Sequence, residues 1–318
     1  MSSFSMKLKN ELLSLSSSDE SLKAMLEGLL QVNGTINLSS TGLFLEFKSK
    51  NEQISQTVAG LIKHFYNLDS IMLKTKEIRL NKDDVYVTEL HQNANIVLSD
   101  LKVLQAKEDS SYNLKKELSS DEAKIGYLRG AFLAAGSIND PKTHTYHLEI
   151  QTFSTLIAYN LRDLMNTFNL GSKISKNRRG YIVYCKSADK IADFIRILGA
   201  SDQLFYFEDL RIERDLSNSI NRVMNCEIAN QKKATVAALR QLDEIAVVEK
   251  FYGERLKNTL KEICVLRKKY PEDSLLELST RSVEEFNKSI SKSAINHRLR
   301  EIHELYLSIK SNQEKNNS

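Results

Sequence analysis

The chain has 318 residues, of which 41% are hydrophobic, so its length and composition predict about two domains with ordinary cores. The net charge of +4 lies wholly beyond residue 210, which favours a polyanionic partner for that end. No run of 18 apolar residues occurs, and the first twenty residues are too charged for a signal peptide. The three cysteines lie far apart in the sequence, which excludes a disulfide framework. We therefore expect a cytoplasmic protein that contacts no membrane.

Two segments of the chain, 102 residues apart, share one pattern. They are residues 21–36 and 123–138. Both carry apolar side chains at helical spacing, and aligning Gly28 with Gly130 also aligns Gly34 with Gly136. A glycine inside a helix costs about 1 kcal/mol relative to alanine, so Gly28 and Gly130 predict close contact between the two helices. Gly34 and Gly136 are predicted to be helix C-caps. The alternative is two unrelated amphipathic helices whose glycines match by chance.

The segments after these two helices also match in kind. In the first copy we expect strands at 35–38 and 43–48, a helix at 53–67, strands at 71–80 and 85–90, and a helix at 96–104. In the second copy we expect a strand at 146–151, a helix at 155–168, strands at 173–175 and 181–186, and a helix at 188–198. Each half therefore predicts an α-β-β-α-β-β-α repeat. The predicted organisation is a domain at 1–205, with repeats at about 5–106 and 121–200, a connector at 107–120 and a linker at 206–220.

The rest of the chain predicts an all-α domain at 221–310 and a disordered tail at 311–318. The fold class is thus α+β with an appended helical domain. Three helices of the second domain are predicted at 255–269, at 274–280 and from 291 onward. Pro271 ends the first, and Ser274 with Glu277 forms a capping box at the start of the second. The segment 281–289 is longer than the turn of three or four residues that a helix-turn-helix normally has.

The third of these helices predicts a DNA-reading face. Its apolar stripe consists of Ile295, Leu299, Ile302 and Tyr306. At 100° per residue, polar side chains fall opposite this stripe or flank it, and they are Lys292, Ser293, Asn296, His297, Arg298 and Arg300. Arginine can bridge O6 and N7 of guanine, and asparagine N6 and N7 of adenine. These residues predict contacts with double-stranded DNA in the major groove, and the alternative is an ordinary solvated helix face.

Two other polar groups are secondary candidates for DNA contact. The first is a basic hairpin of the second repeat, made of Lys173, Lys176, Arg178 and Arg179. The second is a helical segment with Asn221, Arg222, Asn225 and Asn230. The alternatives are a solvated loop for the hairpin, and backbone capping or contact with the first domain for the asparagines. No cluster of residues has metal-ligand spacing, so we expect no metal and no cofactor.

Residues 26–34, LEGLLQVNG, and 128–136, LRGAFLAAG, resemble degenerate LAGLIDADG motifs of homing endonucleases. In that family the penultimate residue of each motif is acidic and holds the divalent metals that activate water. The corresponding residues here are Asn33 and Ala135. An amide is a poor magnesium ligand and a methyl group is none, so the resemblance implies a nuclease fold without catalytic residues.

A closer resemblance is to the WhiA family of bacterial regulators. It rests on residues 127–141, on the asparagine-rich segment at 221–230, and on residues 290–300. The family implies a degenerate LAGLIDADG domain joined to a helix-turn-helix, and a nucleoid-associated transcription factor tied to cell division, chromosome segregation and, in sporulating relatives, sporulation. The implied partners are double-stranded DNA and other transcription or cell-division proteins.

Two alternative functions remain open. The first is an active metal-dependent endonuclease that uses displaced acids such as Glu27 or Asp140. The second is an N-terminal lobe that binds a protein or a small ligand, with DNA bound only at the other end.

Overall fold

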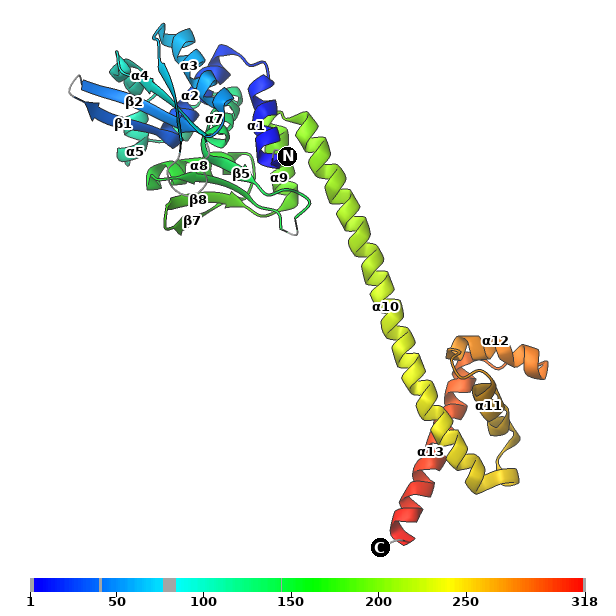
Figure 1. Cartoon of the computed structure of the whole chain (residues 1–318). Coiled ribbons are helices and arrows are strands. Elements are labelled where there is room, and N and C mark those ends of the chain that lie inside the picture. Colours follow the sequence, from blue (N-terminus) through cyan, green and yellow to red (C-terminus); the bar gives the residue numbers. More distant parts are fainter. Residues whose placement is uncertain (1–2, 40–41, 77–83, 144, 317–318) are drawn as a thin grey trace. The chain divides into compact units, whose positions relative to one another are not determined.

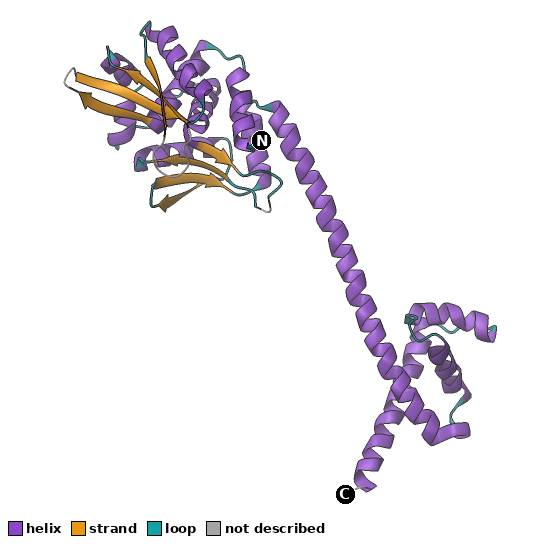
Figure 2. Cartoon of the chain, viewed as in Figure 1, coloured by secondary structure: helices purple, strands orange, loops and turns teal. Residues whose placement is uncertain are grey.

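The computed structural model describes residues 3–39, 42–76, 84–143 and 145–316. The chain divides into two compact units, Met1–Arg214 and Asp215–Ser318 (Figure 1). The first unit mixes helices and strands, whereas the described part of the second unit has helices and no strand (Figure 2). The predicted fold class, α+β with an all-α C-terminal domain, is confirmed.

The first unit contains the two predicted repeats. The first repeat consists of α2 (Asp19–Asn33), β1 (Gly34–Ser39), β2 (Gly42–Ser49), α3 (Glu52–Tyr66), β3 (Ile71–Lys76), β4 (Asp84–Leu90) and α4 (Ala94–Asp100). The second repeat consists of α7 (Asp121–Ala135), β5 (Gly136–Ile138), β6 (Leu148–Thr152), α8 (Thr155–Thr167), β7 (Lys173–Asn177), β8 (Gly180–Cys185) and α9 (Ala188–Leu198). Both have the expected α-β-β-α-β-β-α order. The part of the predicted strand that covers 77–80 lies outside the described residues.

Besides the repeats and the start of α10 (Ser201–Tyr252), the described part of the first unit contains three further helices. They are α1 (Phe4–Ser14), α5 (Val103–Glu108) and α6 (Leu114–Glu117). The single helix predicted at 96–104 is wrong, because Lys102 has a left-handed backbone with φ of 50° and separates α4 from α5. The predicted connector at 107–120 is partly helical, since it includes α6 and the end of α5.

Within the described residues, each repeat forms a four-stranded antiparallel sheet. The strand orders are β1-β2-β4-β3 and β5-β6-β8-β7, so the two sheets have equivalent topology. The register places Ile36 opposite Leu45 in one sheet and Ile138 opposite Leu148 in the other. Helices from both repeats contribute to one continuous hydrophobic core.

Helices α2 and α7 pack closely through their glycines, as the repeat pattern predicts. A Cβ atom added to Gly28 would lie 2.4 Å from the carbonyl oxygen of Tyr127, and one added to Gly130 would lie 2.0 Å from that of Met25. Both distances are far below a normal contact, so a side chain at either position would push the helices apart.

Gly34 and Gly136 are the C-caps of α2 and α7, but neither is left-handed, which corrects the expected reason for these glycines. Their φ angles are −70° and −80°, because the chain continues directly into β1 and β5. Glycine is required here for space. A Cβ on Gly34 would lie 2.5 Å from the carbonyl oxygen of Leu30, and one on Gly136 would lie 2.1 Å from the ring of Phe132.

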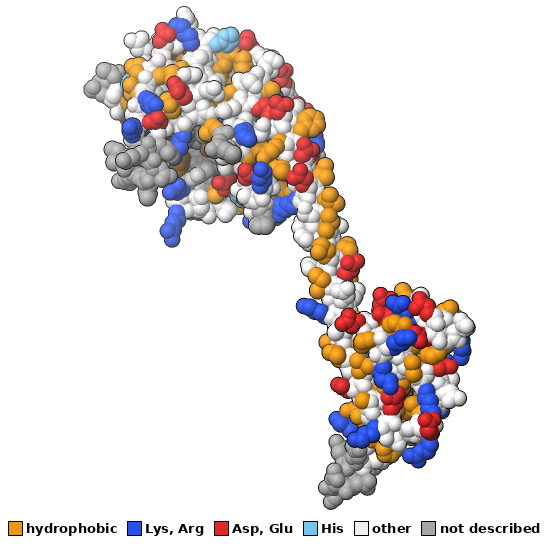
Figure 3. Space-filling model, turned by 45° about the vertical axis from the view of Figure 1, so that its right-hand side comes forward, with side chains coloured by type: hydrophobic (Ala, Val, Ile, Leu, Met, Phe, Trp, Pro, Cys, Tyr) orange, Lys and Arg blue, Asp and Glu red, His pale blue; other side chains and the backbone are white. Residues whose placement is uncertain are grey.

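Helix α10 (Ser201–Tyr252) passes through the boundary between the units, so the predicted linker at 206–220 is helical. No proline or glycine interrupts residues 201–252, which allows the helix to continue. Its exposed length carries apolar side chains (Figure 3), including Ile212, Leu216 and Val223. Of the predicted tail, 311–316 belong to α13 and 317–318 lie outside the described residues.

The second unit packs three helices against the end of α10. They are α11 (Asn258–Lys269), α12 (Leu275–Phe286) and α13 (Lys292–Asn316), and a 3₁₀ turn, Gly253–Arg255, precedes them. Buried side chains from all four helices form a second core, for example Ile245, Ile263, Leu278 and Leu299. None of the described helices is both long enough and apolar enough to cross a bilayer.

Candidate nucleic-acid interface

Helices α12 and α13 are joined by a short, hydrogen-bonded turn. The capping box of Ser274 and Glu277 begins α12 as predicted, but α12 continues to Phe286, so the expected long connection at 281–289 is wrong. The buried Ser282 lies in this extension, and its Oγ accepts a hydrogen bond of 2.9 Å from the backbone N–H of Ile290, which ties α12 to the turn. The remaining turn, 287–291, is close to the length of a helix-turn-helix turn.

Helix α13 has the two faces that its sequence predicts. Ile295, Leu299 and Ile302 are at most 4% exposed and lie in the core, and Tyr306 is half-buried against it. Lys292, Ser293, His297 and Arg300 are exposed, and Asn296 is half-buried. In the part of the chain that is described, the side chains of these five residues form no hydrogen bond or ion pair, so their donors and acceptors are available to a partner.

Arg298 lies apart from that set. Its Nη1 atom is 2.9 Å from Oε2 of Glu262 and donates to the carbonyl oxygen of Thr259 at 3.2 Å. Only 17% of the side chain is exposed, because position 298 lies about 60° from the buried Ile295 around the helix. Arg298 therefore holds α13 against α11, and the same Glu262 is 3.9 Å from the ammonium group of Lys288.

The basic hairpin lies at the β7–β8 turn of the first unit. Lys173, Lys176, Arg178 and Arg179 are all exposed. The turn is tight because Oδ1 of Asn177 accepts the backbone N–H of Arg179 at 2.8 Å and because Gly180 has a φ of +115°. The four cations thus lie on one tight hairpin.

The asparagines of α10 are exposed and do not form one group. Asn221 and Asn225 lie about 40° apart around the helix, whereas Asn230 points to the opposite side. Asn230 lines a groove of about 610 Å³ together with residues of the α11–α12 connection, including Asp273 and Ser274. The asparagines and the basic hairpin belong to different units.

The two positions that the LAGLIDADG resemblance aligns with metal ligands, Asn33 and Ala135, carry no carboxylate. Asn33 ends α2 and donates its amide to the carbonyl oxygen of Lys48 at 2.8 Å, and Ala135 ends α7. Among the described residues, no three His, Cys, Asp or Glu side chains are grouped to hold a metal ion. The displaced acids are also engaged, since Asp140 accepts the backbone N–H of Lys142 at 2.9 Å.

Glu27 is partly buried near the contact between α2 and α7. It accepts hydrogen bonds from Gln31 at 2.8 Å and from Tyr112 at 3.1 Å. Burial raises the pKa of this carboxyl to about 7, which weakens it further as a metal ligand at neutral pH. Glu27 is therefore part of a polar network between the repeats.

Three family models match successive parts of the chain. They are the WhiA N-terminal LAGLIDADG-like domain at 19–104, the WhiA LAGLIDADG-like domain at 124–217 and the WhiA C-terminal HTH domain at 220–306. The "Probable cell division protein WhiA" of Bacillus subtilis (strain 168) is 39% identical over 315 residues, which cover 98% of each chain. The chain belongs to the WhiA family. The WhiA of Bacillus cytotoxicus, with the same name, is 41% identical over 309 residues, 95% of this chain and 96% of its own.

A solved WhiA structure has the same fold. Full-length WhiA from Thermatoga maritima matches with a TM-score of 0.57 and 23% identity, over 96% of this chain and 99% of that chain. The family resemblance predicted from the sequence motifs is confirmed. The two LAGLIDADG-like domains begin with α2 and within α7, and the HTH domain extends from residue 220 of α10 into α13.

Sequence reasoning missed one cation beside this interface. Lys288 lies in the turn before α13, and 57% of its side chain is exposed. It falls within the segment 281–289, which was expected to be a long loop, so the sequence did not predict that Lys288 lies just before the first turn of α13. The charge of the residue was the only available signal.

Proposed function

We propose that this WhiA-family chain is a sequence-specific DNA-binding transcription regulator of cell division and chromosome segregation, acting at the nucleoid. The proposal rests on α12, the turn and α13, which together present an exposed polar face with unpaired side chains. The names of the WhiA relatives support the link to cell division. A role in sporulation is proposed only for sporulating relatives.

In this proposal α13 lies in the major groove and the rest of the second unit holds it there. Arg300 and Asn296 contact base edges, with Ser293 and His297 beside them. Lys292 and Lys288, at and before the start of α13, contact phosphates. Arg298 acts as a positioning residue through Glu262. We propose the domain limits expected from the sequence, 1–205 and 221–310, and the second of these domains carries this function.

Direct titration of the full chain with a labelled random duplex tests DNA binding itself. We expect the chain to bind at low salt. The logarithm of the association constant should fall linearly with the logarithm of the salt concentration, because cations on α13 release counterions from the phosphates. Fluorescence anisotropy over a salt series gives both the affinity and the slope. Absence of binding at low salt, or binding that salt does not weaken, would contradict the proposal.

The first unit is proposed to be inactive as a nuclease. With Asn33 and Ala135 at the ends of α2 and α7, supercoiled plasmid should remain intact in magnesium or manganese. Gel electrophoresis of plasmid incubated with the full chain checks this, with an active homing endonuclease in the same buffers as the positive control. Nicking that copurifies with the protein would show that the activity survives.

Limited proteolysis tests the proposed division into domains. The exposed length of α10 has no core to pack in, so it should open locally more often than either unit. Trypsin should therefore cut first near Arg222, next to the linker proposed at 206–220, and two resistant fragments should remain. A single resistant fragment that spans this stretch, identified by mass spectrometry, would mean that the domains are not independent.

A further inference from the structure

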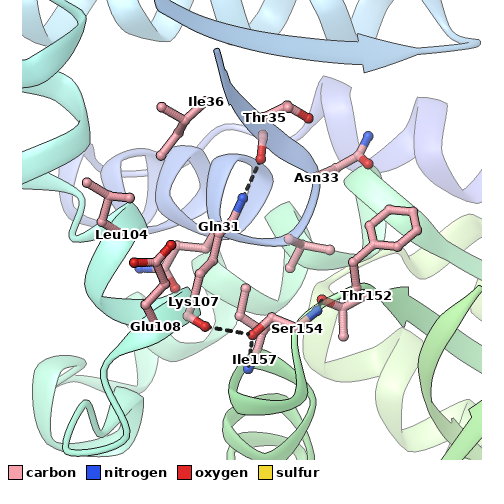
Figure 4. Close-up of a pocket in the computed structure, with 13 residues that line it drawn as sticks. Gln31, Asn33, Thr35, Ile36, Leu104, Lys107, Glu108, Thr152, Ser154 and Ile157 are labelled. Carbon is pink, nitrogen blue, oxygen red and sulfur yellow. Dashed lines mark hydrogen bonds between the residues drawn. The ribbon is translucent and has the colours of Figure 1, made fainter. Parts of the chain in front are cut away.

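A cavity of about 520 Å³ lies in the first unit, at the end of α2 (Figure 4). Its walls come from three segments, namely 31–36 of the first repeat, 152–157 of the second repeat, and 104–108 of α5. This volume falls within the range of about 300–1,000 Å³ that is typical of small-molecule sites in proteins. The proposed function of the second unit does not use this cavity.

Lys107 provides the positive charge of the cavity. Its ammonium group donates a hydrogen bond to the carbonyl oxygen of Gly34, and it forms no ion pair with a carboxylate among the residues that the structure describes. Burial lowers the pKa of this amine, although Glu108 nearby opposes that effect. The carboxylate of Glu108 also lines the cavity, but it forms no ion pair with Lys107 among the described residues. A half-buried ammonium group that bonds only a carbonyl oxygen is costly, and an anion bound directly to it would relieve that cost.

The rest of the lining combines polar groups with apolar surface. Asn33, Thr35, Thr152 and Ser154 supply hydroxyl and amide groups, and the hydroxyl of Ser154 donates to the carbonyl oxygen of Lys107 at 3.2 Å. Apolar side chains complete the wall, among them Ile36, Leu104, Phe153 and Ile157. The ring of Phe153 is 72% exposed, so one face of an aromatic group is open to a ligand.

We propose that this cavity binds a small organic anion with a planar ring, of the mononucleotide class. The anionic group pairs with the ammonium of Lys107, and the ring packs against Phe153. The side chains of Asn33 and Thr35, which line the cavity and are not buried, bond the remaining polar atoms of the ligand. This inference is independent of DNA binding by α13.

Isothermal titration of the full chain with the four ribonucleoside 5′-monophosphates tests the proposal. We expect at least one of them to bind about tenfold more tightly than either inorganic phosphate or its own nucleoside, because the site holds both halves of the ligand. Lys107→Met should weaken that binding about tenfold by removing the charge-assisted hydrogen bond. Lys142→Met, at an exposed position outside the cavity, is the matched control and should bind as the parent does.

The exposed Phe153 offers a second variant that leaves the core intact. Phe153→Ala should weaken the monophosphate and leave the weak binding of inorganic phosphate unchanged. The proposal is overturned if no monophosphate binds more tightly than its halves, or if folded Lys107→Met binds as the parent does. A third result would also overturn it: no monophosphate binds, but a random DNA duplex protects Lys107 from amine-reactive labelling. The cavity would then hold the backbone phosphates of DNA.

Discussion

Arg300→Ala should weaken binding to a specific duplex by roughly 1–3 kcal/mol and remove the preference for one base pair. Arg300 is exposed on α13, about 140° from the buried Ile295, and its guanidinium forms no bond within the described chain. It is therefore free to form two hydrogen bonds to a guanine. Competition between specific and random duplexes, with parent and variant compared, measures the effect.

The control for this prediction is Lys292→Ala at the start of the same helix. A phosphate contact carries no base information, so this variant should weaken all duplexes alike and reduce the salt slope by about one unit. If Arg300→Ala lowers the affinity for specific and random duplexes equally, Arg300 is a backbone contact and the proposed docking of α13 is wrong.

Gly130→Ala should destabilise the first unit by about 3 kcal/mol. The new methyl group would lie 2.0 Å from the carbonyl oxygen of Met25 and 2.9 Å from the backbone nitrogen of Leu29. Both are backbone atoms of α2, so the clash cannot be relieved by rotating a side chain, and the paired helices must separate. Chemical denaturation followed by circular dichroism gives the change in the free energy of unfolding.

Gly60→Ala is the matched control, because Gly60 also lies inside a helix, α3, but nothing stands within 4 Å of the added Cβ atom. There the substitution should stabilise the protein by up to about 1 kcal/mol through helix propensity. Equal effects of the two substitutions would show that the approach of α2 and α7 is looser than described.

Most of the architecture can be predicted from periodicity in the sequence. The matched glycines at 28 and 130 predict the paired helices, and alternating apolar residues predict the strands after them. The continuous α10 could not be predicted from periodicity. A helix that packs against a core has its apolar residues on one stripe, and the exposed apolar residues of α10 do not form one. The length of α12 was also missed, since its last turns carry few apolar residues and pack through contacts such as the buried hydrogen bond between Ser282 and Ile290, which exist only in the fold.

The candidate site was likewise predictable from the sequence only in part. Spacing of 100° per residue correctly separates the buried side of α13 from Lys292, Ser293, His297 and Arg300. It cannot show that Arg298 is bound to Glu262, because that ion pair depends on how α11 packs. The cavity around Lys107 could not be foreseen either, since its walls are brought together from segments that are far apart in the sequence.

Selection of bound duplexes from a random pool, with the full chain, tests most directly whether the protein reads DNA sequence. We predict that one motif is enriched over successive rounds, and that Arg300→Ala loses the preference at one position of that motif while the protein stays folded. If the pool stays random although binding depends on salt, sequence-specific recognition is contradicted. If Arg300→Ala enriches the same motif with all base preferences unchanged, the proposal that α13 contacts the bases is contradicted.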